Sequence, residues 1–342
     1  MNPGIHIFER LPQVDASPAG TSELARPPVR GQPLVGLVRN VRSHRNARGG
    51  APDALPDNVL LATPRLRSEL PAILADLAAK RVDYIAIDGG DGTVRDVLTC
   101  GMGVFGDSWP TLIVLPSGKT NALGHDLGLP QDFTLDDALA AAASGTLVRR
   151  QPLVITQRDK ADAQVCGFVM GAGAFNRAIT LGQRSHKLGA FNAAVVGLTA
   201  LWSVGQALFG SYSNPWRQGT RMRLRLADGS DLPHRGGLPS DERYMLFAST
   251  LERFPAGLDP FRGIDSALRL GVFDNPRRNL LLRFAAVARG TAGRKTRLLG
   301  FHSFGADVLD LDISDAFILD GEAFPAGSYR LSAGPKLRFV VP

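Results

Sequence analysis

Short apolar runs alternate with helical stripes over the first part of the chain. Four runs have nearly continuous apolar residues, which predicts buried strands at residues 34–39, 58–63, 83–87 and 111–115. Leucine and isoleucine recur at helical spacing over residues 64–80, and further helices are predicted at residues 93–98, 120–127 and 134–143. Buried strands that alternate with helices are typical of a parallel sheet with helices on both faces.

The pattern changes near residues 145–150. Short alternating runs, typical of antiparallel strands, follow at residues 221–226, 244–249, 268–272, 308–313, 317–319, 329–332 and 337–341. Helices are predicted at residues 176–183, 188–209 and 279–288. We therefore expect an α/β domain over residues 33–147 and a β-rich, sandwich-like domain over residues 148–342. Whether the last strands return to the first domain is left open.

The N-terminal end and one apolar stretch raise the question of location. Residues 1–32 are rich in proline and show no periodicity, so we predict a mobile leader, and they lack the pattern of a secretory signal. Residues 189–209 approach the length of a membrane span, but polar residues interrupt them, which favours a buried helix. The two cysteines, Cys100 and Cys166, form no C-x-x-C pair. A reducing, cytoplasmic location fits best.

Composition and charge narrow the classes of partner. Hydrophobic residues make up 44% of the chain and charged residues 21%, which excludes general disorder. The 39 basic residues exceed the 32 acidic ones, and most are arginine, which favours bidentate contact with phosphate or carboxylate. Seven of them form a basic zone: Arg277, Arg278, Arg283, Arg289, Arg294, Lys295 and Arg297. Since Phe284 alone among residues 277–297 is aromatic, too few for an interleaved base-stacking surface, this zone favours an anionic membrane surface, bound peripherally, over nucleic acid. The alternative interpretation is a solvated face.

The strongest chemical signal follows the strand predicted at residues 83–87. It is the run Asp88-Gly89-Gly90-Asp91-Gly92-Thr93, which leads directly into a predicted helix. Glycine lets the backbone approach a ligand closely, and the start of a helix presents free amides that suit phosphate. Asp91 would repel bare phosphate, but it fits a Mg²⁺ bridge, because Mg²⁺ is held by one or two carboxylates plus phosphate oxygens. The alternative is a plain turn in which Asp91 caps the helix.

A second loop, Pro116-Ser117-Gly118-Lys119-Thr120-Asn121, follows the strand predicted at residues 111–115. It supplies a hydroxyl, an ammonium and a carboxamide at the start of a helix. It does not match the P-loop pattern, because no glycine stands five residues before Gly118. The alternative interpretation is a capped helix.

A third loop, Asp320-Gly321-Glu322, follows the strand predicted at residues 317–319. Two carboxylates that flank a glycine can share one turn. Close like charges raise the pKa of one of them, which suits a base that works near neutral pH. Taken alone, the run is also an ordinary hairpin tip.

These three loops, in this order, resemble the diacylglycerol kinase catalytic-domain family, which includes bacterial lipid kinases, sphingosine kinases and ceramide kinases. Gly89–Thr93 looks like the family's G-G-D-G-T motif, Pro116–Asn121 is similar to P-x-G-T-x-N, and the D-G-E motif is intact at 320–322. The run Gly171–Phe175 also resembles a glycine-rich segment of the family. The resemblance covers roughly residues 34–342.

The chain departs from the family pattern at four places. The family's N-P-x-S-G after the first strand is reduced to Asn40 and Ser43, and His44 stands in the place of its glycine. Lys119 replaces the usual threonine, and Asp96 stands where a glutamate is usual. Ser249-Thr250 replaces an N-G pair. These changes bear on the substrate and the catalytic rate more than on the fold.

The resemblance implies both a fold and an activity. The first domain would be a nucleotide-binding α/β domain similar to those of phosphofructokinase and NAD kinase, and the second would hold a lipid, with the active site between them. The implied activity is an ATP-dependent lipid kinase that transfers the γ-phosphate to a hydroxyl of a diacylglycerol-like or sphingoid-like acceptor. Which lipid is phosphorylated, and whether the chain forms a homodimer, stay open.

The resemblance also implies roles for particular residues. Those implied to surround ATP are Asn40, Gly89, Gly90, Gly92, Thr93, Gly118, Lys119, Thr120 and Asn121. Mg²⁺ would be held by Asp91 and Asp320. Glu322 would be the base that takes the proton of the acceptor hydroxyl, and Asp91 is the alternative base. Phosphoryl transfer then depends mainly on positioning and charge neutralisation.

Two other functions compete with this one. An NAD kinase-like phosphotransferase shares the predicted first domain, but the loops at Pro116–Asn121 and Asp320–Glu322 argue against it. A catalytically weakened lipid-binding regulator is kept open by the changes at His44, Asp96 and Lys119.

Overall fold

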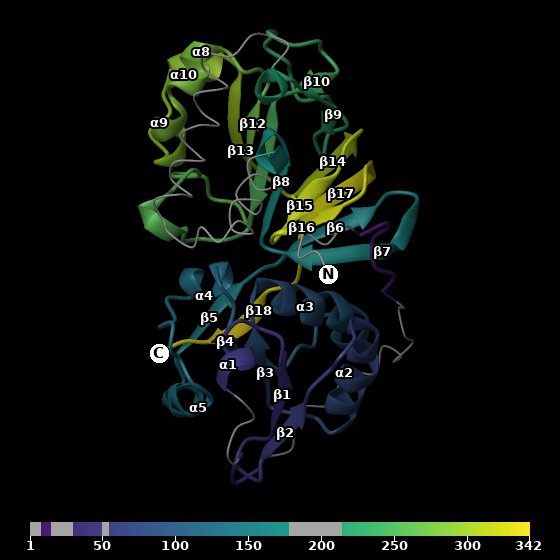
Figure 1. Cartoon of the computed structure of the whole chain (residues 1–342), viewed down its shortest axis with the longest axis vertical. Helices are drawn as coiled ribbons and strands as arrows, with labels where there is room; N and C mark the ends of the chain where they lie inside the picture. Colours follow the sequence, from purple (N-terminus) through teal and green to yellow (C-terminus); the bar gives the residue numbers. More distant parts are fainter. Residues whose placement is uncertain (1–7, 15–29, 50–54, 178–213) are drawn as a thin grey trace.

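The computed structural model describes residues 8–14, 30–49, 55–177 and 214–342. It has two parts, stacked along the long axis of the molecule (Figure 1). The helix predicted at residues 188–209, and most of the one at 176–183, lie outside the described residues. Within the described residues no helix is both long and apolar enough to span a membrane.

The first part is built on one six-stranded sheet. Its strands are β1 (Val35–Arg39), β2 (Val59–Ala62), β3 (Tyr84–Gly89), β4 (Thr111–Pro116), β5 (Leu147–Arg150) and β18 (Leu337–Val340), in the order β2-β1-β3-β4-β18-β5. All neighbours are parallel except β18 and β5. The last strand of the chain therefore lies in the first sheet, where it is the yellow strand among the blue ones in Figure 1.

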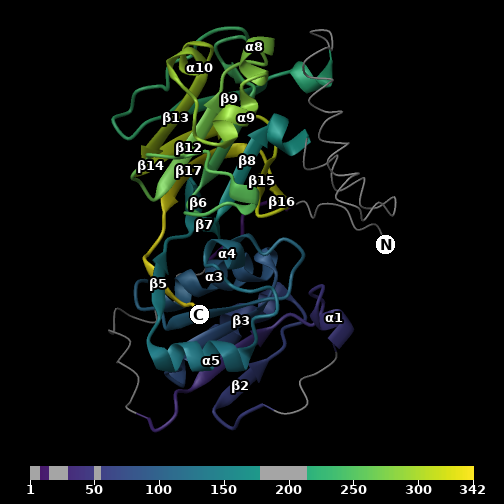
Figure 2. The ribbon, with the colours of Figure 1, turned by 90° about the vertical axis from the view of Figure 1, so that its left-hand side faces the viewer.

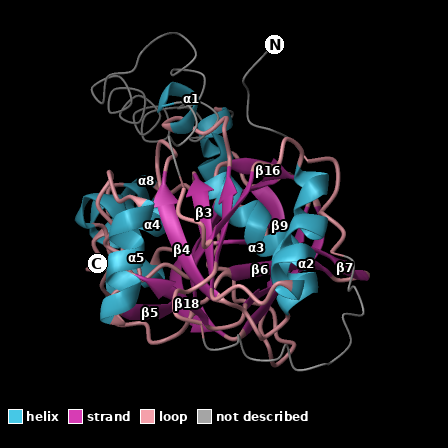
Figure 3. Cartoon of the chain, turned by 90° about the horizontal axis from the view of Figure 1, so that it is seen from below, coloured by secondary structure: helices cyan, strands magenta, loops and turns pink. Residues whose placement is uncertain are grey.

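Helices cover both faces of this sheet (Figure 3). They are α1 (Asn46–Gly49), α2 (Leu70–Ala79), α3 (Asp91–Phe105), α4 (Ala122–Asp126) and α5 (Leu135–Ser144), with a 3-10 turn, η1 (Arg67–Glu69), before α2. Leucines of α2 pack with Ile85 and Ile87 on one face, whereas Ala138 of α5 packs with Ala86 and Ile113 on the other. α5 begins with a capping box in which Thr134 and Asp137 bond each other's backbone N–H.

The second part is a sandwich of two antiparallel sheets. One has the order β10-β9-β14-β17-β6-β7, from β10 (Glu242–Arg243), β9 (Thr220–Arg225), β14 (Val308–Ile313), β17 (Gly327–Ala333), β6 (Leu153–Gln157) and β7 (Lys160–Gly167). The other has the order β13-β12-β11-β8-β15-β16, from β13 (Phe301–Ala306), β12 (Leu268–Phe273), β11 (Met245–Ser249), β8 (Val169–Gly173), β15 (Phe317–Leu319) and β16 (Glu322–Phe324).

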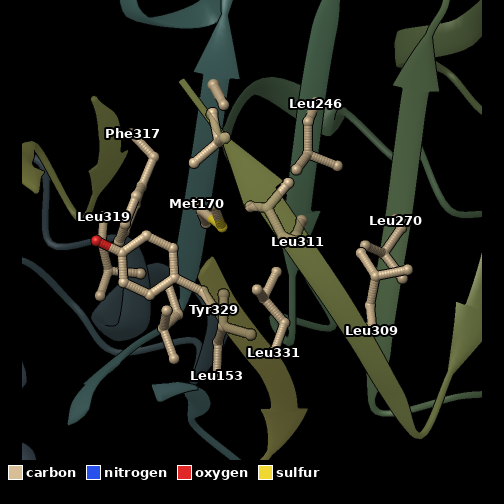
Figure 4. Packing of buried hydrophobic residues seen from close by; sticks show 14 of the residues in the cluster. Leu153, Met170, Leu246, Leu270, Leu309, Leu311, Phe317, Leu319, Tyr329 and Leu331 are labelled. Carbon is tan, nitrogen blue, oxygen red and sulfur yellow. The ribbon is translucent and has the colours of Figure 1, made fainter. Parts of the chain in front are cut away.

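Alternation along the strands explains the core of the sandwich. In β14 every second residue is buried, so that Leu309, Leu311 and Ile313 point inward. They pack with Met170 and Leu246 of the other sheet (Figure 4). The prediction of a parallel α/β domain with a β-rich second domain is confirmed. The closer likeness to phosphofructokinase and NAD kinase stays a prediction.

Short helices and turns complete the second part: η2 (Pro215–Arg217), η3 (Pro255–Gly257), α8 (Arg278–Leu281), α9 (Phe284–Ala288) and α10 (Arg294–Leu298). The single helix predicted at residues 279–288 is wrong. The chain forms α8 and α9 instead, because Arg283 leaves helical geometry, with φ −94° and ψ 4°. Figure 2 shows these helices at the end of the molecule away from the first sheet.

The prediction of a mobile leader does not hold for residues 8–14. Phe8 donates its N–H to the carbonyl of Ala323, and Gln13 bridges to Ala163 at the edge of β7. Leu11 is buried in the core of the sandwich. This segment is held because it supplies apolar side chains and backbone partners to sheet edges that would otherwise be open.

Candidate active site

The first two predicted loops meet at one edge of the parallel sheet. β3 and β4 are parallel neighbours, so the residues that follow them leave the sheet on the same side. Gly90 and Gly118 touch there, because a Cβ placed on Gly118 would lie 2.5 Å from the Gly90 Cα. A Cβ on Gly90 would lie 2.9 Å from the Gly118 Cα. Only residues without side chains allow the two loops to pack this closely.

Asn40 joins the first strand to the same site. Its side-chain N–H donates to the Thr93 hydroxyl at 2.9 Å, and its backbone N–H donates to the carbonyl of Asp88. A Cβ on Gly89 would lie 2.4 Å from that hydroxyl oxygen, so this glycine makes room for Thr93. The structure therefore brings Asn40 and Thr93 together, as the motifs predicted.

Asp88 lies beneath the loops, and sequence reasoning missed its role. The side chain is buried and accepts hydrogen bonds from Asn46 at 2.9 Å and from the Ser117 hydroxyl. Arg39 lies 3.5 Å from its other carboxylate oxygen. Asp88 thus ties the ends of β1, β3 and β4 to one buried charge. An acid at the end of an otherwise apolar strand was the signal that could have indicated it.

The residues of the second loop differ in what they contact. Asn121 has a left-handed backbone, with φ 49° and ψ 52°, and its side chain bonds both the N–H and the carbonyl of Gly118. This carboxamide therefore closes its own loop. Lys119 is exposed and lines the cavity described next, whereas Thr120 is exposed and does not line it.

A cavity of about 500 Å³ opens where these loops face the second part of the molecule. It is lined by Asn40, Arg42, Ser43, His44, Gly90, Gly92, Thr93, Arg95, Asp96, Gly118, Lys119 and Glu322. Of these, Glu322 alone comes from the sandwich, at the start of β16. Glu322 Oε1 would lie 4.0 Å from a Cβ on Gly92. The third predicted loop therefore reaches the first across the cavity, while Gly89, Asp91, Thr120, Asn121 and Asp320 are not among the lining residues.

Asp320 is held by backbone rather than pointed into the cavity. The backbone φ of Asp320 is 46° and that of the next residue, Gly321, is 85°, so the turn is left-handed at both positions. Its carboxylate accepts hydrogen bonds from the N–H groups of Phe168 and Val169. Burial, with a further contribution from the negative charge of Asp91, raises the pKa of Asp320 to about 7. The expected raised pKa in this loop thus falls on Asp320, and burial and Asp91 are its causes.

Asp91 lies at the junction of two helix starts. It is the first residue of α3, and its carboxylate accepts a hydrogen bond from the N–H of Leu123 in α4 at 3.4 Å. Burial raises its pKa, although the backbone N–H groups of α4 act in the opposite direction. Two buried acids with raised pKa values, one of them raised in part by the charge of the other, are a suitable pair for a divalent cation. The described residues contain no group of three or more His, Cys, Asp or Glu side chains that could hold a metal ion.

The positions that depart from the family pattern have definite surroundings. Asp96 lies 3.0 Å from Arg95 Nη2 and 3.6 Å from Arg67 Nε. Ser249 is buried and donates its hydroxyl to the carbonyl of Phe168, which is a structural contact. Arg95 itself is buried and reaches Glu322, which sequence reasoning did not foresee. An arginine next to the first apolar residue of α3 was the available signal.

Fold and site together define a two-part protein in which a glycine-rich pair of loops at the edge of a parallel sheet faces an acidic turn of a β-sandwich. Residues 61–152 match the model of the diacylglycerol kinase catalytic domain. The resemblance that the motifs predicted is therefore confirmed.

Curated relatives match part of the chain. The chain is 35% identical over 99 residues to the "Probable lipid kinase YegS" of Shigella flexneri, and equally to that of Escherichia coli O1:K1 / APEC. The match covers 29% of this chain and spans only 30% of the length of each relative.

Solved structures match nearly the whole chain in fold. A crystal structure of a diacylglycerol kinase from Bacillus anthracis str. Sterne covers 92% of this chain and 99% of its own, with a TM-score of 0.58 and 15% identity. A second crystal structure from the same organism covers the same shares with a TM-score of 0.63 and 14% identity. At this identity the likeness concerns the fold alone.

Proposed function

We propose that this protein is an ATP-dependent lipid kinase. One observation carries the proposal: the backbone contact of Gly90 with Gly118 forms a platform at the edge of the parallel sheet, and Glu322 of the sandwich faces it across the cavity. A platform of glycine amides at the start of a helix suits phosphates. A carboxylate on the opposite wall suits an acceptor hydroxyl.

Nucleotide phosphates would lie over the glycine platform. The backbone amides around Gly90, Gly92 and Gly118 would bind phosphate oxygens, and Lys119 would neutralise charge at the rim. Asn40 would act mainly by holding the Thr93 hydroxyl, and Asn121 by closing the second loop. Among the predicted phosphate contacts, Thr120 has the weakest support, because it lies away from the cavity lining.

Mg²⁺ would be held at Asp91 and Asp320. Burial raises the pKa of both acids, and the charge of Asp91 adds to the rise at Asp320, so a bound cation would favour the charged form of each. When bound, Mg²⁺ would neutralise phosphate charge. Both carboxylates already accept backbone N–H groups, Asp320 from Phe168 and Val169 and Asp91 from Leu123.

Glu322 is the proposed base for the acceptor hydroxyl. It lines the cavity opposite Gly92, whereas Asp91 is bonded to the start of α4 and is not among the lining residues. This geometry favours Glu322 over the alternative base, Asp91. Replacement of Glu322 by glutamine should abolish most turnover while leaving ATP binding intact. Near-normal turnover would exclude Glu322 as the base.

The proposed lipid acceptor calls for a membrane surface, and α8–α10 are the proposed contact. All seven residues of the basic zone are exposed, and residues 275–306 contain no acidic residue. Three apolar side chains lie exposed among them: Leu282 at 69%, Phe284 at 45% and Leu298 at 57%. Cations beside exposed apolar groups suit an anionic bilayer, which offers both headgroups and acyl chains.

One experiment tests the central proposal. The protein is incubated with γ-labelled ATP, Mg²⁺ and separate vesicles that contain diacylglycerol, monoacylglycerol, a sphingoid base, ceramide or phosphatidylglycerol, with NAD as a soluble acceptor. Label in one lipid is the expected result. Label in NAD alone would favour the NAD kinase-like alternative, and vesicle binding without any label would favour a lipid-binding regulator.

A further inference from the structure

Arg95 is a buried cation in the wall of the candidate active site. Its side chain is 2% exposed, and Nη2 lies 3.0 Å from Asp96 Oδ1 and 3.8 Å from Glu322 Oε1. A Cβ on Gly92 would lie 3.7 Å from the same nitrogen. The guanidinium therefore stands where the glycine loop and the sandwich approach each other. Burying a charge costs free energy unless ion pairs and hydrogen bonds compensate for the lost solvation, so the burial of Arg95 needs an explanation.

Aromatic rings hold this guanidinium in place. Its Cζ lies 5.6 Å from the ring centre of Phe8 and 5.9 Å from that of Phe324. The two rings stack at 4.7 Å with an angle of 1° between their planes. A planar, weakly hydrated guanidinium suits contact with ring faces, and lysine would reproduce its charge but not its planar shape.

The N-terminal segment supplies one of these rings and also reaches the loop of Glu322. Phe8 donates its backbone N–H to the carbonyl of Ala323, the residue after Glu322, at 2.9 Å. Phe324, the partner ring, is the next residue along β16. Arg95 is thus connected to Glu322 by its own side chain, and to the two residues that follow Glu322 through Phe8 and the Phe324 ring.

The contacts of Arg95 are incomplete within the described residues. Nε and Nη2 both bond Asp96 Oδ1, while Nη1 is buried and has no hydrogen-bond partner there. Arg95 also lines the cavity. A residue that only tied α3 to β16 would not need to combine a cavity position, a spare donor and a contact with the acidic turn.

We propose that Arg95 is a positioning residue that holds the Glu322 carboxylate over the glycine loop, and that residues 8–14 complete the site by packing Phe8 against it. This inference rests on the proposed kinase function, because it assigns Arg95 a role through the proposed base. Misplacement of a reacting group by about 1 Å can cost about 100-fold in rate.

A double-mutant cycle tests the inference. Arg95→Ala is expected to lower kcat by about 100-fold, with KM for ATP changed by less than about threefold, since the nucleotide loops are untouched. In the Glu322→Gln background the same change should lower kcat by less than about threefold, because the group that Arg95 holds is already disabled. An equal loss in both backgrounds would overturn the proposal.

Arg67→Ala is the matched control. Arg67 also lies over the Phe8 ring, at 5.4 Å, and pairs with Asp96, but its described contacts do not include Glu322. It should therefore change kcat by only a few fold. Arg95→Lys should restore part of kcat through its charge, and it replaces Arg95→Ala in the cycle if the alanine variant does not fold. Phe8→Ala should show the same signature as Arg95→Ala, more weakly.

Hydrogen exchange separates this inference from the proposed function. If the wild-type protein phosphorylates no lipid, the kinase proposal fails. The positioning role is then judged from exchange of the backbone amides of residues 320–324, which Arg95→Ala should accelerate at least tenfold and Arg67→Ala should leave nearly unchanged. Equal protection in both variants would show that Arg95 does not hold this turn.

Discussion

At the scale of single residues, the contact between Gly90 and Gly118 determines how closely two loops approach. Gly118→Ala would place a Cβ 2.5 Å from backbone and 2.7 Å from the Asn121 side chain, and the backbone cannot swing aside. We expect this variant to lose about 1–3 kcal/mol of unfolding free energy by overpacking and to bind ATP at least tenfold more weakly. Chemical denaturation and calorimetric titration with ATP measure the two effects.

Gly49→Ala is the control for this prediction. A Cβ on Gly49 meets no atom within 4 Å, so stability and ATP affinity should stay close to those of the wild type. If Gly118→Ala behaves like Gly49→Ala, the two loops do not need their close contact.

The raised pKa of Asp320 predicts how the free energy of unfolding changes with pH. Its folded pKa, about 7, lies above the ordinary value of 3.8, so the folded protein holds this proton more tightly than the unfolded chain does. Protonated Asp320 therefore favours the folded state. This contribution to the free energy of unfolding is fully present below about pH 4 and is lost as the pH rises through about 7. Asp91→Asn removes a neighbouring negative charge and should lower the pKa of Asp320, which shrinks this loss. NMR titration of labelled aspartate carboxyl carbons, with denaturation at several pH values, measures both.

A remote aspartate provides the comparison for the pH experiment. Asp228 is exposed and bonds Ser230 in another loop, so Asp228→Asn should leave the titration of Asp320 unchanged. The assigned cause is wrong if the pKa of Asp320 is the same in Asp91→Asn as in the wild type.

Motif residues could be predicted from the sequence more readily than the residues that support them. Loops that follow buried parallel strands share one edge of a sheet, so the meeting of Asn40, Thr93 and Gly118 was predictable. Arg95 and Asp88 could not be assigned in this way, because their partners come from segments far away in sequence. Asn121 was predicted to contact phosphate, but its left-handed backbone turns its carboxamide back onto Gly118.

At the scale of elements, α8–α10 combine exposed cations with exposed apolar side chains. Each basic residue near an anionic bilayer contributes about 1 kcal/mol. Reversal of Arg277, Arg278 and Arg283 to glutamate should therefore weaken binding to anionic vesicles by at least about 100-fold. ATP affinity should stay unchanged, because these residues lie outside the cavity lining. Vesicle sedimentation and calorimetry give the two affinities.

The control for the surface is a second triple reversal with the same change in net charge. Arg48, Arg65 and Arg149 are exposed in the first part of the molecule. If their reversal weakens vesicle binding as much as the first set does, net charge rather than α8–α10 attracts the membrane. Equal loss of vesicle binding and ATP binding in the first set would also contradict the assignment.

Whether a segment forms a helix or a strand could be predicted where its hydrophobic pattern ran over many residues or alternated strictly. The buried strands β1, β3 and β4 and the alternating β14 follow from local pattern, since each presents one burial pattern along its length. β2 forms where a buried strand was predicted, but it lies at the edge of the sheet and only Val59 is buried in it. β6, β7 and β8 escaped prediction. The split between α8 and α9 could not be foreseen either, because both halves keep helix-forming residues and the break appears only in the backbone at Arg283.

At the scale of the whole molecule, the first sheet is completed by the last strand of the chain. β18 pairs with β4 and β5, so residues 337–340 cross back from the sandwich. The pairing of distant segments cannot be derived from local pattern, and the sequence left this point open. The first sheet is therefore complete only when the chain has returned to it from the sandwich.

Asp126 supplies a second connection between the two parts. It is 0% exposed; its carboxylate pairs with Arg150 at 2.6 Å and accepts the N–H groups of Glu252 and Arg253, which follow β11 of the sandwich. Asp126→Ala leaves Arg150 and two backbone donors without this partner. Breaking a buried pair in this way costs about 3–5 kcal/mol. Chemical denaturation should show that loss, and a larger radius of gyration by X-ray scattering should show that the two parts separate.

Asp231→Ala, which breaks an exposed pair with Arg223, is the control and should change both quantities far less. If the two variants behave alike, β18 and the core beside α3 suffice to join the two parts, and Asp126 does not contribute to holding them together.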